Sequence, residues 1–137
     1  MSLEVQVVSP ERILYTGTAT MVVARTVGGG DIAFLTGHAP FIGALAIHQV
    51  KVVTEAGDEQ LIAVHGGFVE VSNSRVTVLS DVAELPEQID VHRAERAKQG
   101  AEEALRADGD DEEAKAALER AELRLLVAQG IPTTAAH

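Results

Sequence analysis

The sequence changes its periodicity once, at Leu85-Pro86, and this change limits the chain to folds with a β half and an α half. Before it, short runs alternate apolar and polar residues with the period of two that is typical of half-buried strands. The runs are LEVQVV (3–8), TATMVVAR (18–25), VKVVT (50–54), LIAVH (61–65), FVEVS (68–72) and RVTVLS (75–80). Their spacing predicts about seven to ten strands, which suits a small sandwich or barrel.

Turn-forming residues separate these runs. Gly, Pro, Asn, Asp and Ser gather at residues 9–10, 16–17, 28–31, 37–40, 55–58 and 72–74. Gly accepts positive φ, Pro presets a turn, and Asn, Asp and Ser bond their own backbone, so we expect the chain to reverse at each of these places.

Beyond residue 86, Ala, Glu and Arg dominate and β-branched residues become rare. Asp90 is placed to cap a helix over residues 91–107, with Asp108-Gly109 as its stop. The acidic cluster 110–113 suits the N-terminus of a second helix, because carboxylates stabilise that end of the helix dipole; this helix should end near Gly130. A short turn between two helices makes an antiparallel hairpin. The predicted fold is therefore α+β, with a β domain over residues 1–86 and a helical hairpin over 87–137.

Alanines form the seam of this hairpin at spacings of three and four. They are Ala94, Ala97, Ala101 and Ala104 on the first helix, and Ala114, Ala117, Ala121 and Ala128 on the second. Small side chains bury little area, and each large apolar residue contributes at most ~1.5–3 kcal/mol when buried. Ordering a residue costs ~1–2 kcal/mol for its backbone alone. We therefore expect a weakly held helical arm that needs a host surface and can exchange one host for another.

Composition excludes several classes of function. With 11 Lys+Arg against 21 Asp+Glu, the formal net charge of -10 disfavours nucleic acid and anionic lipid as partners. No apolar run approaches the ~18 residues of a membrane span. The start of the chain, MSLEVQVVSPER, lacks the basic and apolar regions of a signal peptide. We expect a chain on the cytoplasmic side that meets a membrane only through a complex.

Motifs for catalysis or metal binding are missing. The five histidines form no short ligand pair such as H-x-x-x-H, and the chain contains no cysteine. Residues 28–30 are three glycines without the Lys-Ser/Thr of a phosphate loop. Residues 108–119 begin like a calcium loop, but Glu113 occupies the position that needs glycine. We predict that the chain is not an enzyme, requires no cofactor and has no metal site.

The stretch FLTGHAPFIGAL (34–45) leaves two readings open. In one, its apolar residues fill the sandwich core while His38 caps a turn bracketed by Gly37 and Pro40. In the other, several of them face outward as a docking patch, since exposed apolar patches on soluble proteins tend to mark partners. Both readings can hold for different residues.

Four stretches, in this order, resemble one family: VSPERILYTGTA (8–19), GDIAFLTGHAPFIGAL (30–45), VHGGFVEVSNSRVTVLSDVAE (64–84) and IDVHRA (89–94). Together with the Ala-rich hairpin they are similar to the epsilon subunit of bacterial F-type ATP synthases. The resemblance implies a flattened β-sandwich followed by two helices, as a non-catalytic part of the rotor stalk at the cytoplasmic face of the cell membrane. Its implied partners are the gamma subunit, the c-ring and the catalytic beta and alpha subunits.

The resemblance also assigns roles to particular residues. The loop of Gly37, His38, Ala39 and Pro40 would face the c-ring. In relatives the helical arm either folds against the sandwich or extends along gamma and blocks ATP hydrolysis. Between residues 87 and 137, seven Lys+Arg stand against twelve Asp+Glu, so the inhibition is expected to be mild.

Some relatives bind regulatory ATP through the pattern I/L-D-x-x-R-A, a preceding Glu and basic residues of the second helix. The matching residues are Glu84, Ile89, Asp90, Arg93, Ala94, Arg120 and Arg124. Arg120 and Arg124 lie one helical turn apart, and arginine forks suit phosphate oxygens. The departure is Gly100, near which such relatives carry another Arg. The alternative is that Asp90 is only a helix cap and the two arginines pair with Glu119 and Glu122.

Two other functions compete with a rotor subunit. One is a free-standing module that senses ATP by closing its hairpin on the nucleotide. The other is a small sandwich that binds carbohydrate or lipid. The lack of Trp and the single Tyr argue against the stacking of sugars.

Overall fold

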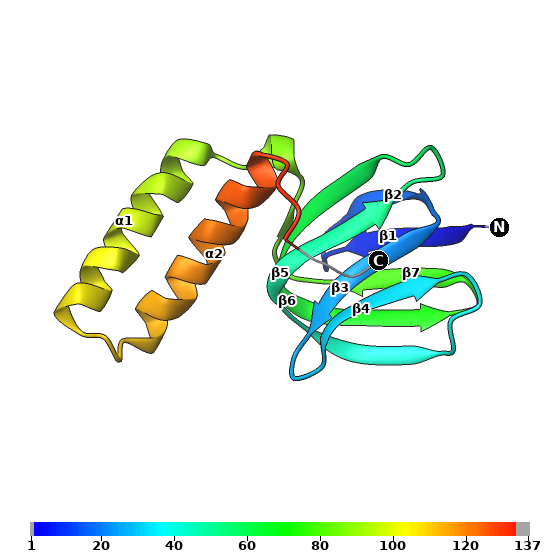
Figure 1. Ribbon diagram of the computed structural model, residues 1–137, viewed down its shortest axis with the longest axis horizontal. Helices are drawn as coiled ribbons and strands as arrows, with labels where there is room; N and C mark the ends of the chain where they lie inside the picture. The colour runs from blue at the N-terminus through cyan, green and yellow to red at the C-terminus, as the bar shows by residue number, and fades with distance from the viewer. Residues whose placement is uncertain (1, 134–137) are drawn as a thin grey trace.

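The computed structural model describes residues 2–133, and it consists of a β-sandwich beside a two-helix hairpin (Figure 1). The strands are β1 (Leu3–Val8), β2 (Ile13–Ala19), β3 (Met21–Thr26), β4 (Gly30–Leu35), β5 (Phe41–Val53), β6 (Glu59–Ser72), β7 (Arg75–Leu79) and β8 (Ala83–Glu84). A short 3-10 helix η1 (Pro86–Gln88) leads to α1 (Val91–Ala107) and α2 (Glu112–Ala128). The predicted α+β fold is confirmed.

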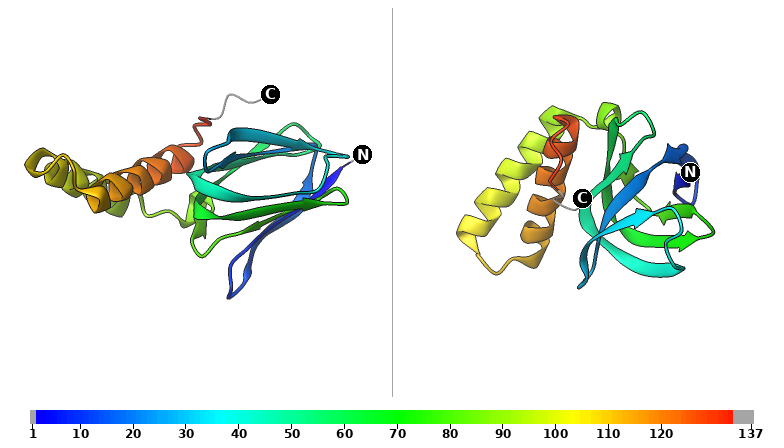
Figure 2. Two further views of the ribbon diagram at one scale, coloured as in Figure 1. Left: turned by 90° about the horizontal axis from the view of Figure 1, so that it is seen from below. Right: turned by 45° about the vertical axis from the view of Figure 1, so that its right-hand side comes forward.

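Two long strands, β5 and β6, build both layers of the sandwich (Figure 2). The sheet runs in the order β2-β1-β7-β6-β5-β3-β4, with β8 added on β6. Residues 68–72 of β6 pair with β7, whereas residues 63–64 pair with β8, so the strand changes layer between them. Gly66 and Gly67 lie at this change with φ of 85° and 124°. A β-carbon on Gly67 would lie 2.1 Å from the Leu79 carbonyl oxygen, so the bend requires glycine.

The core lies between the two layers and is aliphatic. Alternate residues point inward, as the period of two requires. The fully buried members include Leu3, Val5, Val7, Val22, Phe34, Val50, Val52, Ile62, Val64, Val69, Val71, Val76 and Val78. The same alternation leaves the opposite faces of these strands for solvent or for partners.

The strand count of eight within residues 2–133 agrees with the prediction, but three boundaries were wrong. Residues 16–17 are no turn, because Gly17 pairs with Val5 inside β2. The run 18–25 is divided at Thr20 between β2 and β3. The runs 61–65 and 68–72 belong to one bent strand, since the Gly66-Gly67 bend keeps both parts paired with β5.

The hairpin begins and ends where the capping residues predict. The Asp90 side chain accepts a hydrogen bond from the Arg93 backbone at 3.0 Å, and Asp111 does the same for Ala114. Asp108 is the C-cap of α1. Of the predicted seam, Ala94, Ala101, Ala114 and Ala121 are buried, and Ala97 is exposed.

Helix α2 lies between α1 and the sandwich, and it is α2 that packs against β5 and β6 (Figures 1 and 2). A small apolar cluster joins α2 to the outer face of β5 and β6. It contains Leu61, Ala63, Ile89, Leu123 and Val127, with Ile47 and Ala128 at its margin. The hairpin therefore has a host surface, and that surface is small.

Candidate functional site

A pocket of about 380 Å3 opens where the two helices meet the edge of the sandwich. It is lined by Glu84 of β8, by Gln88 of η1, by Asp90, Arg93, Ala94 and Ala97 around α1, and by Ala117, Arg120 and Arg124 of α2. Six of the seven residues predicted for a nucleotide site thus share one pocket. The seventh, Ile89, is buried in the apolar cluster beneath α2.

The start of α1 positions the first cation. Because Asp90 caps the helix, the backbone turns there and Arg93 lines the pocket from the first helical turn. Ala97 follows one turn later, and Ala117 of α2 also lines the pocket. Both side chains are small and both line the pocket, so part of the predicted alanine seam borders this opening.

The second helix supplies two more cations, and each has an acidic partner. Arg124 Nε lies 2.7 Å from Glu84 Oε1, and Arg120 Nη2 lies 3.3 Å from Glu113 Oε1. The predicted alternative pairing with Glu119 and Glu122 is wrong, because the helix turns both arginines toward the pocket while those acids lie exposed. Its other half, Asp90 as a cap, is confirmed.

Glu84 connects the pocket to the sandwich. Its Oε1 also lies 3.0 Å from Nε2 of His65, a side chain that is 4% exposed. Burial raises the pKa of Glu84, but hydrogen bonds from His65 and Arg124 outweigh it and hold that pKa below its ordinary value. Glu84 is therefore a charged carboxylate at neutral pH that bridges β6 and α2.

Sequence reasoning missed three lining residues: Gln88, Ala97 and Ala117. The alanines carried a signal, since their spacing placed them on the seam, but only the packed helices show where the seam opens. Gly100 lies beyond the pocket lining, and a β-carbon there would meet no atom within 4 Å. Taken together, the pocket offers three guanidinium groups beside two carboxylates, Glu84 and Asp90, and the guanidinium groups suit an anion with several oxygens.

The loop of Gly37, His38, Ala39 and Pro40 joins β4 to β5 at one end of the sandwich. The His38 backbone donates to the Leu35 carbonyl at 3.0 Å, and Gly37 takes a φ of 85°, which makes a tight turn. The His38 ring packs edge-on against Phe34, with centroids 5.0 Å apart. The reading of His38 as a turn residue is confirmed.

Beside that loop both readings of the apolar stretch hold. Phe34 and Leu45 are buried in the core, whereas Leu35 is 53% and Ile42 is 71% exposed. Across the same outer face, Ala44 pairs with Phe68, Phe68 with Leu79, and Leu79 with Val8. We call Ile42, Ala44, Phe68, Leu79 and Val8 the outer apolar row.

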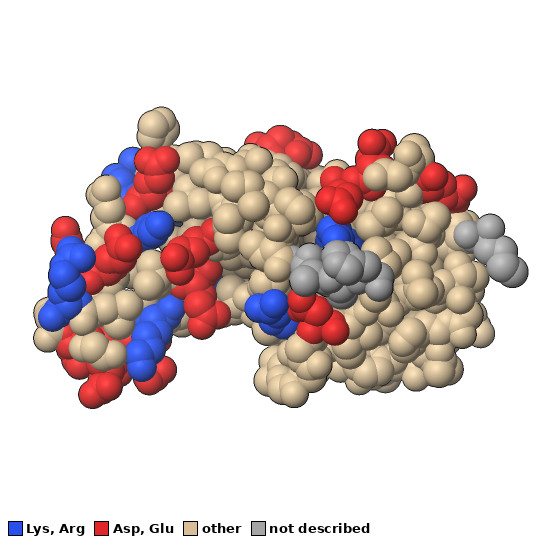
Figure 3. Space-filling model, viewed as in Figure 1, with Lys and Arg blue, Asp and Glu red and all other residues tan. Residues whose placement is uncertain are grey.

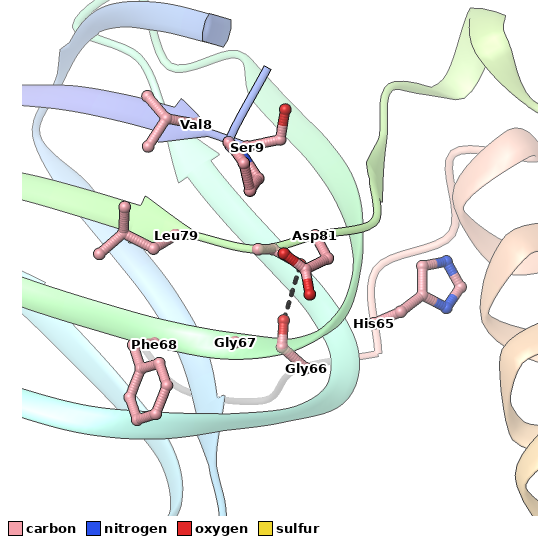
Figure 4. A pocket seen from close by; sticks show the side chains of 10 residues that line it. Val8, Ser9, His65, Gly66, Gly67, Phe68, Leu79 and Asp81 are labelled. Carbon is pink, nitrogen blue, oxygen red and sulfur yellow. Dashed lines mark hydrogen bonds between the residues drawn. The ribbon is translucent and has the colours of Figure 1, made fainter. Parts of the chain in front are cut away.

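A second pocket of about 300 Å3 adjoins this row near the bend of β6 (Figure 4). Val8, Phe68 and Leu79 line it together with Gly66, Gly67 and Asp81. His65 is also part of the lining, and its ring extends toward the helices (Figure 4). Charged side chains gather over the hairpin on the face that Figure 3 shows, whereas the sandwich is largely uncharged there.

Comparison with known proteins agrees with this architecture. Residues 2–86 match the family described as ATP synthase, Delta/Epsilon chain, beta-sandwich domain, and residues 87–129 match its long alpha-helix domain. The ATP synthase epsilon chain of Streptomyces coelicolor is 41% identical over 128 residues, which cover 93% of this chain and 96% of that one. The epsilon chain of Brevibacillus brevis is 44% identical over 103 residues, covering 75% and 77%.

A solved structure shares the fold. A chain in the Euglena gracilis mitochondrial ATP synthase assembly of OSCP, F1 and c-ring superposes with a TM-score of 0.76 at 22% identity, covering 93% of this chain and 81% of that one. A chain of that ATP synthase assembly thus has the same fold as this one.

The chain belongs to the ATP synthase delta/epsilon family, and its resemblance to the bacterial epsilon subunit is confirmed. Between residues 2 and 133, neither helix has the length and apolar character to cross a bilayer.

Proposed function

We propose that the chain is a non-catalytic subunit of the rotor stalk of an F-type ATP synthase, at the cytoplasmic face of the cell membrane. In this role the sandwich links gamma to the c-ring. The outer apolar row supports the proposal, because Ile42 at 71% and Phe68 at 56% exposure form a surface that a partner can cover. The 37–40 loop lies at an end of the sandwich and is proposed as the c-ring contact.

The outer apolar row also favours a subunit over a free-standing ATP sensor, which has no use for such a surface. Capture of the purified chain by the gamma subunit of the same genome tests this choice. Phe68→Ser should abolish capture, whereas Thr77→Ser, on the adjacent strand, should preserve it. Full capture of the Phe68→Ser chain would contradict the assigned surface.

For the hairpin we propose inhibition of ATP hydrolysis when it leaves the sandwich and extends toward the alpha and beta subunits. Support comes from the small apolar cluster beneath α2, which offers little area to hold the helices. Deleting residues 88–137 and measuring hydrolysis by the assembled complex tests this role. The rate should rise moderately; an unchanged rate would remove the inhibitory role.

The pocket at Arg93, Arg120 and Arg124 is proposed as a regulatory ATP site. The convergence of three guanidinium groups from two helices carries this proposal. Bound nucleotide would bridge α1 and α2, and ligand that binds only the docked state stabilises it by mass action.

An ATP titration followed by amide spectra tests the site in the intact chain. Shifts should concentrate at Asp90, Arg93 and Arg124. Arg93→Gln should weaken binding by about tenfold or more, the loss expected for one charged hydrogen-bonding partner. Arg96→Gln, on an exposed position of the same helix outside the pocket, is the matched control. Equal affinity of both variants would contradict the assignment.

A further inference from the structure

The chain that follows α2 returns to the sandwich, where the side chains of Gln49 and His48 in β5 contact it. Gln49 of β5 is fully buried. Its Nε2 donates to the Ile131 carbonyl at 2.6 Å, and its Oε1 accepts from the Thr133 backbone at 3.0 Å. The two contacts join positions 82 and 84 residues apart in the chain.

This pairing copies a peptide group. A residue in a parallel β-ladder bonds the carbonyl before and the N–H after its opposite residue, and the Gln49 carboxamide does the same on either side of Pro132. Pro132 has no N–H, so this arrangement leaves no backbone donor between the two bonded residues without a partner. A shorter amide or a carboxylate at position 49 could not reproduce both bonds.

The segment that Gln49 binds is connected to the end of α2 by a turn of fixed geometry. Gly130, with φ of 72°, follows α2, and its N–H donates to Val127 while the Ile131 N–H donates to Leu126. These are the two bonds of a Schellman motif, which sets the direction in which the chain leaves a helix. If α2 moved away while residues 131–133 stayed bound to Gln49, the hydrogen bonds at the end of the helix would have to break.

Thr133 also contacts His48, the residue that precedes Gln49 in β5. Its hydroxyl lies 3.1 Å from His48 Nε2. The contacts of Gln49 and His48 lie just beyond the C-terminal end of α2. The ion pair between Glu84 and Arg124 lies about one helical turn before that end, on the side of the pocket. The apolar cluster under α2 is thus supplemented by polar contacts at two separate places.

We propose that residues 131–133 form a clasp with Gln49 as its receptor, and that the helical hairpin leaves the sandwich only after this clasp opens. When it opens, a buried amide loses both partners at once, which opposes release more strongly than the loss of an exposed hydrogen bond. The clasp requires no nucleotide, so it regulates the arm independently of the proposed ATP site.

Native-state hydrogen exchange of the full chain without nucleotide tests the clasp through the amides of α2. Thr133→Pro removes the gripped N–H at an exposed position outside every helix and strand, so the sandwich should fold normally. Gln49→Met keeps an unbranched side chain of similar length without polar atoms. Each should speed exchange at Leu123 and Val127 about tenfold, equivalent to about 1.4 kcal/mol, with β1 and β7 unaffected.

The double variant distinguishes a clasp from two unrelated effects. Because both substitutions break the same contact, the double variant should exchange no faster than either single variant. Thr133→Ala keeps the N–H and loses only the hydroxyl, so its exchange should stay near that of the unaltered chain. Additive effects, or unchanged α2 exchange in Thr133→Pro, would overturn the proposal.

Discussion

Arg124 of α2 and Glu84 of β8 form an ion pair of 2.7 Å across the boundary between hairpin and sandwich. The carboxylate oxygen that Arg124 reaches is also the one that His65 contacts. A single atom thus ties the last short strand of the sandwich, its bent strand β6 and the second helix together. The charges of Glu84 and Arg124 therefore lie at the boundary where the hairpin would separate from the sandwich.

Docking of the hairpin should weaken in acid because of Glu84. Its folded-state pKa lies below the ordinary 4.5, so its contribution is fully present above pH 4.5 and disappears as the pH falls through the folded value. Exchange of α2 amides between pH 7 and pH 3 measures this, after correction for intrinsic rates. In the Glu84→Gln variant, the acid-induced increase in exchange of the α2 amides should be lost. If that increase remained unaltered, it would arise from another titratable group.

Gly67→Ala should destabilise the sandwich by about 2–4 kcal/mol, since it combines a strained φ with a clash that only backbone movement can relieve. The clash is with the Leu79 carbonyl at 2.1 Å. Urea unfolding measures the loss. If the variant were as stable as the original chain, the bend between the layers could not depend on this glycine.

Gly100→Ala should have the opposite effect. Gly100 lies within α1, where an added β-carbon meets open space. Replacing glycine by alanine in a helix interior stabilises by roughly 0.5–1 kcal/mol. The thermal unfolding of the hairpin should therefore move upward while that of the sandwich stays in place. A lower hairpin midpoint would show that this position has a role beyond helix formation.

Leu123→Ala should loosen the arm without harming the sandwich. Leu123 is buried among Leu61, Ala63 and Val127, and truncating a buried leucine costs about 2–5 kcal/mol. A fluorophore pair on introduced cysteines at exposed Asp58 and Glu103 reports the separation, since the chain has no cysteine of its own. The separated population should rise at least tenfold, and Glu122→Ala, at an exposed neighbouring position, should leave it unchanged.

Local signals in the sequence accounted for the helices almost to the residue. Asp90, Asp108 and Asp111 act through bonds to neighbours in the chain, so their effect does not depend on the rest of the fold. The motif at residues 89–94, read through the family resemblance, supplied three of the nine residues that line the arginine pocket, Asp90, Arg93 and Ala94. Strands were harder to delimit, because whether Gly17 or Gly66 interrupts a strand depends on what pairs beside it.

The sequence by itself determined the two halves and the core residues of most strands, since periodicity and capping are short-range properties, whereas the arginines of the site were indicated by the family resemblance. Tertiary structure alone decided which acids meet Arg120 and Arg124, that Ala97 and Ala117 face an opening, and that Gln49 holds the segment after α2. These contacts join residues up to 84 positions apart. Apart from the Arg120–Glu113 pair, which lies within α2, no local pattern encodes these contacts, because they form only when sheet closure and helix docking bring distant strands and helices together.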